Sequence, residues 1–264
     1  MGKKGSLVSL FLLLVLLVGQ TLTAQTVELK VGASPTPHAE ILEVVKPMLA
    51  AEGIQLRIIE FQDYVQPNLA LAEGELDANF FQHVPYLEQF SEDHRLDLTY
   101  IAKVHVEPMG VYSKKITKLE RLRNRAVVAV PNDPTNCGRA LMLLQQAKLI
   151  ELKAGVGLLA TEFDIVKNPK NIQVRALEAA QLPRVLPEVD LAVINTNYAL
   201  PAGLVPTRDA LFIEGAESPY ANVLAVRTAD RDNPALQKLA WALNSPEVKA
   251  YLLENYSGDI VPAF

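Results

Sequence analysis

The chain has 264 residues, half of them hydrophobic, which is enough to bury one large core or two modest ones. The formal net charge is −5 and the 25 basic residues are scattered, so a nucleic-acid-binding surface is not indicated. The single cysteine, Cys137, excludes an internal disulfide framework, and the four histidines show no metal-binding spacing. Neither a metal nor a cofactor is therefore expected.

The N-terminal segment has the pattern of an export signal. Lys3 and Lys4 precede an almost entirely apolar run over residues 7–19, and the small residue Ala24 closes the segment. This run is shorter than the roughly 18 to 20 residues that span a bilayer. Residues 1–24 are therefore predicted to be a signal peptide, with an uncleaved membrane anchor as the alternative. Because no cysteine lies near this junction, lipid attachment through an N-terminal cysteine is not expected.

The rest of the chain alternates short strand patterns with helical ones. Residues 27–31 alternate apolar and polar side chains, residues 41–49 have helical spacing, and residues 54–58 return to a period of two. Residues 127–130 and 191–194 are almost entirely aliphatic, which is typical of strands buried on both faces of a parallel sheet. The alternation predicts an α/β architecture.

Ligands of open α/β sheets bind beyond the carboxyl ends of the strands. The chain has four segments that follow a predicted strand: residues 33–38, 81–86, 131–139 and 195–198. These segments are the places where a binding site is expected.

One group of candidate residues is aromatic. Phe81, His83 and Tyr86 lie within six residues directly after a predicted strand, and Tyr64 lies one short helix upstream. Together they can line an apolar slot. An aromatic cluster of this kind can also be part of a core, and His83 can be a structural histidine.

The second group is polar and suits the head group of an amino acid. Arg139 lies near the start of a predicted helix, where free N–H groups and the helix dipole favour an anion. Asn195 and Asn222 carry amide oxygens that can accept from an ammonium group without adding a charge. With the aromatic slot, these residues indicate a site for an α-amino acid. Individually, Arg139 can be a surface residue and Asn195 a helix cap.

Five sequence blocks resemble the methionine-binding receptors of ABC importers, the NlpA-type lipoprotein family. They follow the family's order and extend over nearly the whole chain after the signal segment. The blocks are residues 64–68 (YVQPN), 77–87 (DANFFQHVPYL), 130–139 (VPNDPTNCGR), 192–196 (AVINT) and 218–222 (SPYAN).

The resemblance implies a two-lobed, type II periplasmic-binding-protein fold with a ligand cleft between the lobes. We expect lobe 1 to comprise residues 26–108 and 223–264, and lobe 2 residues 109–222. The protein would bind L-methionine and deliver it to an ABC permease with its cytoplasmic ATPase, with no chemical step. D-methionine and a methionyl peptide remain open as ligands, and a monomer is expected.

The resemblance also assigns roles to individual residues. Tyr64, Phe81, His83 and Tyr86 would surround the methionine side chain, because a thioether gains from contacts with aromatic rings. The polar residues would hold the head group: Arg139 for the carboxylate, Asn195 and Asn222 for the zwitterion, and Asn136 at the helix start.

The sequence departs from the family at two points. Most relatives carry an N-terminal cysteine that tethers them to a membrane, and its lack here predicts a free receptor in the periplasm of a two-membrane bacterium. Cys137 replaces the aliphatic residue usual in relatives, and a helix start favours its thiolate. An exported thiol-dependent enzyme using Cys137, with His83 or His105 as base, is therefore the alternative, although a packed, inert thiol is preferred. A surface adhesin without a small ligand is a third hypothesis.

Overall fold

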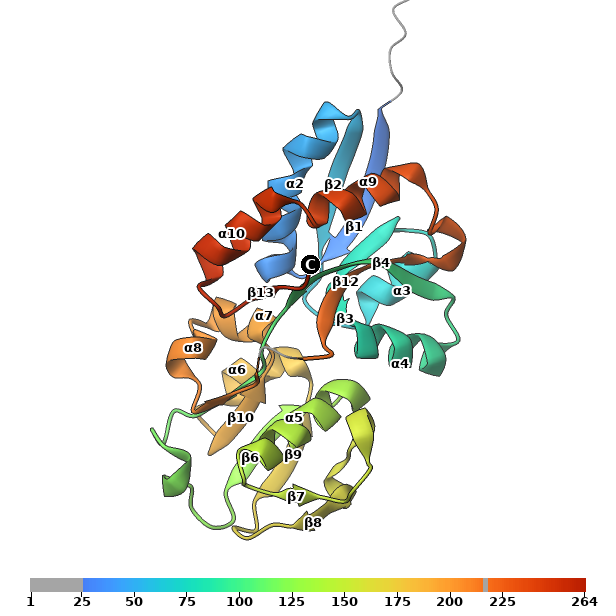
Figure 1. Ribbon diagram of the computed structural model, residues 1–264. Helices are drawn as coiled ribbons and strands as arrows, with labels where there is room; N and C mark the ends of the chain where they lie inside the picture. The colour runs from blue at the N-terminus through green and yellow to red at the C-terminus, as the bar shows by residue number, and fades with distance from the viewer. Residues whose placement is uncertain (1–25, 216–217) are drawn as a thin grey trace, which may run out of the picture.

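The computed structural model describes residues 26–215 and 218–264. Most of the chain forms two separate β-sheets with helices packed against them, so the predicted α/β architecture is confirmed. Figure 1 shows the larger sheet in one body of the molecule and the smaller sheet in a second body beside it. The predicted signal peptide, residues 1–24, lies outside the described residues.

The larger sheet has the strand order β13-β4-β12-β3-β1-β2. Strands β1, β2 and β3 are parallel, whereas β12 and β13 run antiparallel to their neighbours. Its strands are β1 (Val27–Ala33), β2 (Ile54–Glu60), β3 (Ala78–His83), β4 (Leu98–Val106), β12 (Ala221–Arg227) and β13 (Val261–Pro262).

The smaller sheet has the order β11-β5-β10-β6-β9, and β7 pairs with β8 in a separate ribbon. Every residue of β10 is buried, and β10 is parallel to β6, as its aliphatic sequence predicted. The strands are β5 (Gly110–Tyr112), β6 (Val127–Pro131), β7 (Glu151–Leu152), β8 (Ile165–Lys167), β9 (Gln173–Leu177), β10 (Leu191–Ile194) and β11 (Phe212–Ile213).

The helices connect the strands and cover the sheets. None of the described helices is both long and apolar enough to span a membrane. The helices are α2 (Glu40–Ala51), α3 (Gln66–Ala72), α4 (Val84–His94), α5 (Pro134–Gln146), α6 (Leu182–Val185), α7 (Thr196–Ala199), α8 (Pro206–Asp209), α9 (Pro234–Leu243) and α10 (Pro246–Tyr256).

Each sheet has its own hydrophobic core. Side chains of α2, α9 and α10 pack with β1, β3 and β4 in the larger core, and the apolar side of α5 packs against β6 and β10 in the smaller one. The chain passes from the first sheet to the second between β4 and β5, and returns between β11 and β12. The ends of β3, β6 and β10 therefore meet between two separately packed bodies (Figure 1).

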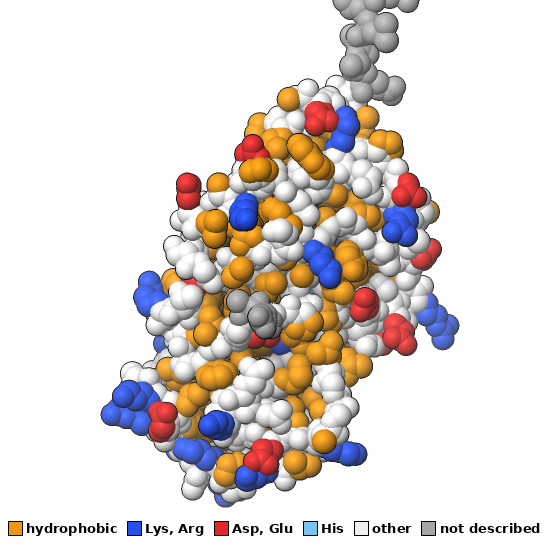
Figure 2. All heavy atoms as spheres, in the orientation of Figure 1, with side chains coloured by type: hydrophobic (Ala, Val, Ile, Leu, Met, Phe, Trp, Pro, Cys, Tyr) orange, Lys and Arg blue, Asp and Glu red, His pale blue; other side chains and the backbone are white. Residues whose placement is uncertain are grey.

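Charged side chains do not gather into one region of the surface seen in Figure 2. Basic and acidic residues are interspersed there, singly or in small groups. This scattered distribution matches the absence of charge blocks in the sequence.

Gly138 is required by close packing. A Cβ atom at this position would lie 2.1 Å from the backbone oxygen of Leu158 and 2.9 Å from the backbone nitrogen of Ala160. Because both neighbours are backbone atoms, the segment would have to move. We expect Gly138→Ala to lower the free energy of unfolding by about 3 kcal/mol.

Urea denaturation measures this effect as a lower midpoint at an unchanged slope. The matched control is Gly215→Ala, since among the described residues no atom beyond its chain neighbours lies within 4 Å of the Cβ that this substitution adds. Equal midpoints for Gly138→Ala and the control would contradict the packing argument.

Candidate functional site

A pocket lies between the two bodies, lined by side chains from both of them. All eight residues predicted from the sequence line this pocket. The lining residues are Tyr64, Phe81, Gln82, His83, Tyr86, Glu107, Asn136, Arg139, Asn195, Thr196, Asn197 and Asn222. Sequence reasoning missed four of them: Gln82, Glu107, Thr196 and Asn197.

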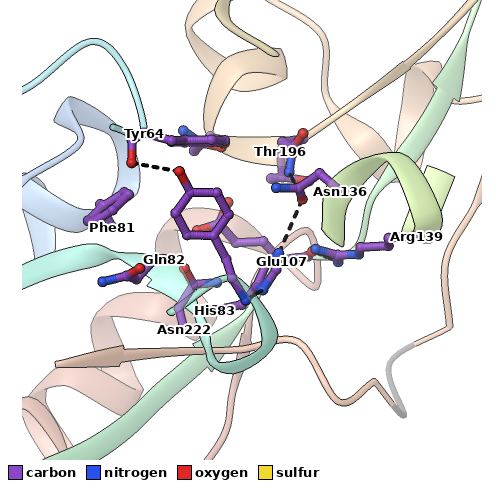
Figure 3. A pocket seen from close by; sticks show the side chains of 12 residues that line it. Tyr64, Phe81, Gln82, His83, Glu107, Asn136, Arg139, Thr196 and Asn222 are labelled. Carbon is purple, nitrogen blue, oxygen red and sulfur yellow. Dashed lines mark hydrogen bonds between the residues drawn. The ribbon is translucent and has the colours of Figure 1, made fainter. Parts of the chain in front are cut away.

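The lining residues come from both sheets. Strand β3 and the start of α4 contribute Phe81, Gln82, His83 and Tyr86, and β12 contributes Asn222. From the other body, α5 contributes Asn136 and Arg139, and the start of α7 contributes residues 195–197. Figure 3 shows Tyr64 and Phe81 on one side of the pocket and Asn136 and Arg139 on the other.

Three aromatic rings form one wall. The Tyr64 ring centroid lies 6.0 Å from that of Phe81 and 5.7 Å from that of Tyr86, at tilted or perpendicular angles. The Tyr86 hydroxyl donates to the backbone oxygen of Tyr64 at 2.8 Å, and the Tyr64 hydroxyl donates to Asn197 at 2.6 Å. Burial raises the pKa of Tyr64 well above its usual value, so this wall is uncharged.

His83 joins the two bodies as a neutral imidazole. Its Nδ1 accepts from the backbone N–H of Tyr86 at 3.1 Å and caps α4, so the ring proton resides on Nε2. This Nε2 donates to Asn136 Oδ1 at 3.1 Å. Burial, aided by the positive charge of Arg139, lowers the pKa of His83 to about 3.

Arg139 is buried and already has an anionic partner. Its Nε donates to Glu214 Oε1 at 3.1 Å and its Nη2 donates to Glu214 Oε2, while Nη2 also donates to the backbone oxygen of Glu107 at 2.7 Å. The guanidinium carbon lies 4.1 Å from the centre of the Tyr220 ring. Arg139 therefore lies in an ion pair within the protein, and the sequence alone did not reveal Glu214 as its partner.

The expected helix start differs in detail. Helix α5 begins at Pro134 and its cap is Asp133, whose Oδ1 accepts from the backbone N–H of Asn136 at 2.9 Å. Arg139 consequently lies in the second turn of the helix. The positive end of the helix dipole and the guanidinium both favour an anion nearby, and Glu214 supplies that anion.

The asparagine amides are divided between structural bonds and unpaired atoms. Asn136 Oδ1 accepts from His83 and, at 2.8 Å, from Asn195 Nδ2, so Asn136 holds other site residues in place. Asn222 Oδ1 lies 3.0 Å from His38 Nε2 and is therefore engaged within the protein. Among the described residues, Asn195 Oδ1 and Asn197 Nδ2 are buried without a hydrogen-bond partner. The pocket thus offers one unpaired acceptor and one unpaired donor.

Glu107 is the acidic residue of the pocket and was not expected. It follows β4 directly, at the point where the chain leaves the larger sheet. Its Oε1 lies 2.8 Å from His105 Nε2 and 3.3 Å from His38 Nε2. The signal in the sequence is a histidine and a glutamate two residues apart at a strand end, since alternate residues of a strand share one face.

Cys137 is packed in the smaller core. Its side chain lies in the apolar cluster with Ala140 and Leu141 of the same helix. Burial raises the pKa of the thiol to about 11, whereas its place near a helix start was expected to favour the thiolate. The thiol is therefore protonated near neutral pH.

Comparison with known proteins assigns most of the chain to one family. The model of the family described as NlpA lipoprotein matches residues 29–264. The chain belongs to the NlpA lipoprotein family. A D-methionine-binding lipoprotein of Salmonella typhimurium is 44% identical to this NlpA family member over 236 residues, which cover 88% of this chain and 87% of that protein.

Solved structures of relatives confirm the predicted two-lobed fold. A nutrient-binding protein of Burkholderia cenocepacia bound to methionine is 48% identical, with a TM-score of 0.87 over 89% of this NlpA chain and 100% of that chain. A periplasmic substrate-binding protein of an ABC transporter from Coxiella burnetii is 49% identical, with a TM-score of 0.85. The match covers 89% of this chain and 100% of that chain.

Proposed function

We propose that this protein is an extracytoplasmic solute receptor that binds L-methionine and delivers it to an ABC permease driven by a cytoplasmic ATPase. The observation that carries the proposal is the composition of the pocket, where an uncharged aromatic wall faces a set of charged and amide groups. D-methionine and a methionyl peptide remain possible forms of the ligand. The methionine bound to the Burkholderia relative supports this ligand class.

The two sides of the pocket match the two ends of methionine. Each good contact between a thioether and an aromatic ring contributes about 0.3 to 1.5 kcal/mol, and the rings of Tyr64, Phe81 and Tyr86 provide such contacts. On the polar side, the guanidinium of Arg139 would bind the carboxylate of the ligand while it keeps its ion pair with Glu214. Asn195 Oδ1 lacks a partner among the described residues and would accept from the ammonium group.

The receptor would bind by closing two lobes around the ligand. We propose residues 26–108 and 223–264 as lobe 1 and residues 109–222 as lobe 2. Residues 221 and 222 pair with β4 in the larger sheet, which favours a return crossing slightly before residue 221. Contacts such as Tyr64 to Asn197 and His83 to Asn136 join the lobes around the pocket. A ligand touching both sides would add further contacts and stabilise the closed state.

We further propose a monomer that is exported to the periplasm and released from its signal peptide, with an uncleaved anchor as the other outcome. Relatives are named lipoproteins, whereas the single cysteine of this chain, Cys137, lies in the smaller core. Attachment through an N-terminal cysteine is therefore not proposed. The mass of the mature protein distinguishes cleaved, uncleaved and lipidated forms.

Equilibrium dialysis with labelled L-methionine tests the receptor function. We expect a dissociation constant below about 1 μM and a loss of at least about tenfold in Asn222→Ala, which removes an amide from the pocket. A surface adhesin without a small ligand would bind no methionine, and the receptor proposal would then be wrong.

Blocking the thiol separates the receptor from a thiol-dependent enzyme. Because Cys137 is buried and its pKa is raised to about 11, reaction with iodoacetamide at neutral pH should be slow, and Cys137→Ala should retain its methionine affinity. A binding or turnover activity that is lost with the thiol would favour the enzyme.

A further inference from the structure

We propose that Glu107 is the residue that receives the ammonium group of the ligand, and that His105 holds its carboxylate in place. This inference rests on the proposed receptor function and names the residue that makes the site specific for a free amine. Figure 3 shows Glu107 between the aromatic side of the pocket and Arg139.

The carboxylate is approached from two elements of the larger body. His105 lies in β4 and His38 in the short helical turn of residues 35–39 that precedes α2. Both Nε2 atoms approach one oxygen, Glu107 Oε1, at 2.8 Å and 3.3 Å. The hydrogen bond from His105 and the close contact with His38 thus hold the group at the border of the two bodies.

Both histidines are neutral donors. Burial lowers the pKa of His38 to about 4 and that of His105 to about 3. Among the described residues, both Nδ1 atoms are buried without partners. With the protons on Nε2, His105 donates to Glu107 and His38 donates to Asn222 Oδ1, and the unpaired Nδ1 atoms are acceptors rather than donors. His105 therefore orients the carboxylate without cancelling its charge, and His38 adds no positive charge beside it.

The charges around the pocket leave Glu107 without a cation of its own. Arg139 is engaged through two nitrogens by Glu214, and its contact with Glu107 is to the backbone oxygen. Across the described part of the chain, the basic side chains within 4 Å of the Glu107 carboxylate are those of His38 and His105, both of them neutral imidazoles. Burial raises the pKa of Glu107, because a buried carboxylate is costly unless a cation faces it. A ligand ammonium is such a cation, and Asn195 Oδ1 offers it a second acceptor.

The same three side chains have the composition of a metal site, since their donor atoms lie within 4.8 Å of one another. The hydrogen bonds favour the ammonium instead. His38 Nε2 lies 3.0 Å from Asn222 Oδ1, and this contact with an oxygen acceptor requires a proton on the nitrogen that a metal ion would need. If methionine binding requires Zn²⁺ or is abolished by EDTA, the proposal is overturned.

Isothermal titration calorimetry with two ligands tests the proposal. The ligands are L-methionine and 4-(methylthio)butanoate, which has the same thioether and carboxylate but no amine. We expect the wild-type protein to prefer methionine at least about hundredfold, because hydrogen bonds to charged groups are strong and an unpaired buried carboxylate is costly. Glu107→Gln should weaken methionine binding at least about thirtyfold and change the affinity for the analogue by less than threefold.

Glu254→Gln is the matched control, since Glu254 is exposed on α10, and it should keep the wild-type preference. Equal wild-type affinities for the two ligands would overturn the inference and leave the receptor function intact, whether or not any variant folds. A Glu107→Gln protein that keeps the wild-type preference would also overturn it. If the wild-type protein binds no methionine, the proposed function itself is wrong and this inference with it.

The positioning role of His105 has its own readout. The titratable or charged groups around Glu107 are His105, His38, Arg139 and, at longer range, Tyr64. His105→Phe removes one donor to the carboxylate, so the pKa of Glu107 should rise further. As the pH is lowered, protonation of Glu107 removes the preference for methionine over the analogue. In His105→Phe this loss should occur at a pH at least about half a unit higher than in wild type. An unchanged pH profile would show that His105 has a packing role alone and would overturn its assignment.

Discussion

Replacing Arg139 with alanine is expected to weaken methionine binding at least about tenfold, which corresponds to about 1.4 kcal/mol. The same change should lower the free energy of unfolding by about 3 kcal/mol. The side chain of Arg139 is 3% exposed and that of its partner Glu214 is 12% exposed. Removing the guanidinium therefore leaves a carboxylate that is mostly buried and unpaired. Calorimetric titration and urea denaturation measure the two effects separately.

A double variant distinguishes binding from folding. Arg139→Ala combined with Glu214→Ala removes both charges, so most of the lost stability should return while methionine affinity stays low. The exposed pair of Arg208 and Asp209 provides the control, because Arg208→Ala removes an exposed ion pair of little energetic value. If the double variant recovers full methionine affinity, Arg139 has no direct role in binding.

The fold could be predicted from the sequence because its signals are local. The alternation in residues 27–31 and the aliphatic run of β10 each record which faces of a strand are buried. The rule that ligands lie beyond the carboxyl ends of strands then gave three segments that line the pocket, residues 81–86, 131–139 and 195–198, whereas residues 33–38 contribute no lining residue. His83, Asn136 and Asn195 lie together for that reason, although 53 and 59 residues separate Asn136 from the other two.

The partners of the site residues could not be predicted, because they depend on packing between distant segments. Glu214 is 75 residues from Arg139 in the sequence, and nothing local marks it as the anion that the guanidinium needs. Asn222 was expected to accept through its oxygen, but His38, which is 184 residues away, already uses that atom. The thiol of Cys137 shows the same limit. Its pKa follows from burial in the folded core, which outweighs its position near the helix start.

Acidification from pH 7.5 to pH 5 is expected to destabilise the protein by about 2 kcal/mol for each of three buried histidines. The pKa values of His38, His83 and His105 are lowered to about 4, 3 and 3 because burial disfavours the charged form. The unfolded chain takes up protons near pH 6.5, where free histidine titrates. Between these values the unfolded state binds more protons, so stability falls as the pH falls. Urea denaturation at several pH values measures the slope.

Two groups determine how this slope should be interpreted. Glu107 acts with the opposite sign, because its raised pKa lets the folded state take up a proton at a higher pH than the unfolded state does, which offsets part of the loss of stability.

His83→Gln removes one of the three buried imidazoles and should reduce the slope of stability against pH by about one proton. His94→Gln, at an exposed position at the end of α4, is the matched control. Equal slopes for wild type and His83→Gln would mean that His83 is not the neutral, buried link that its contacts with Tyr86 and Asn136 indicate.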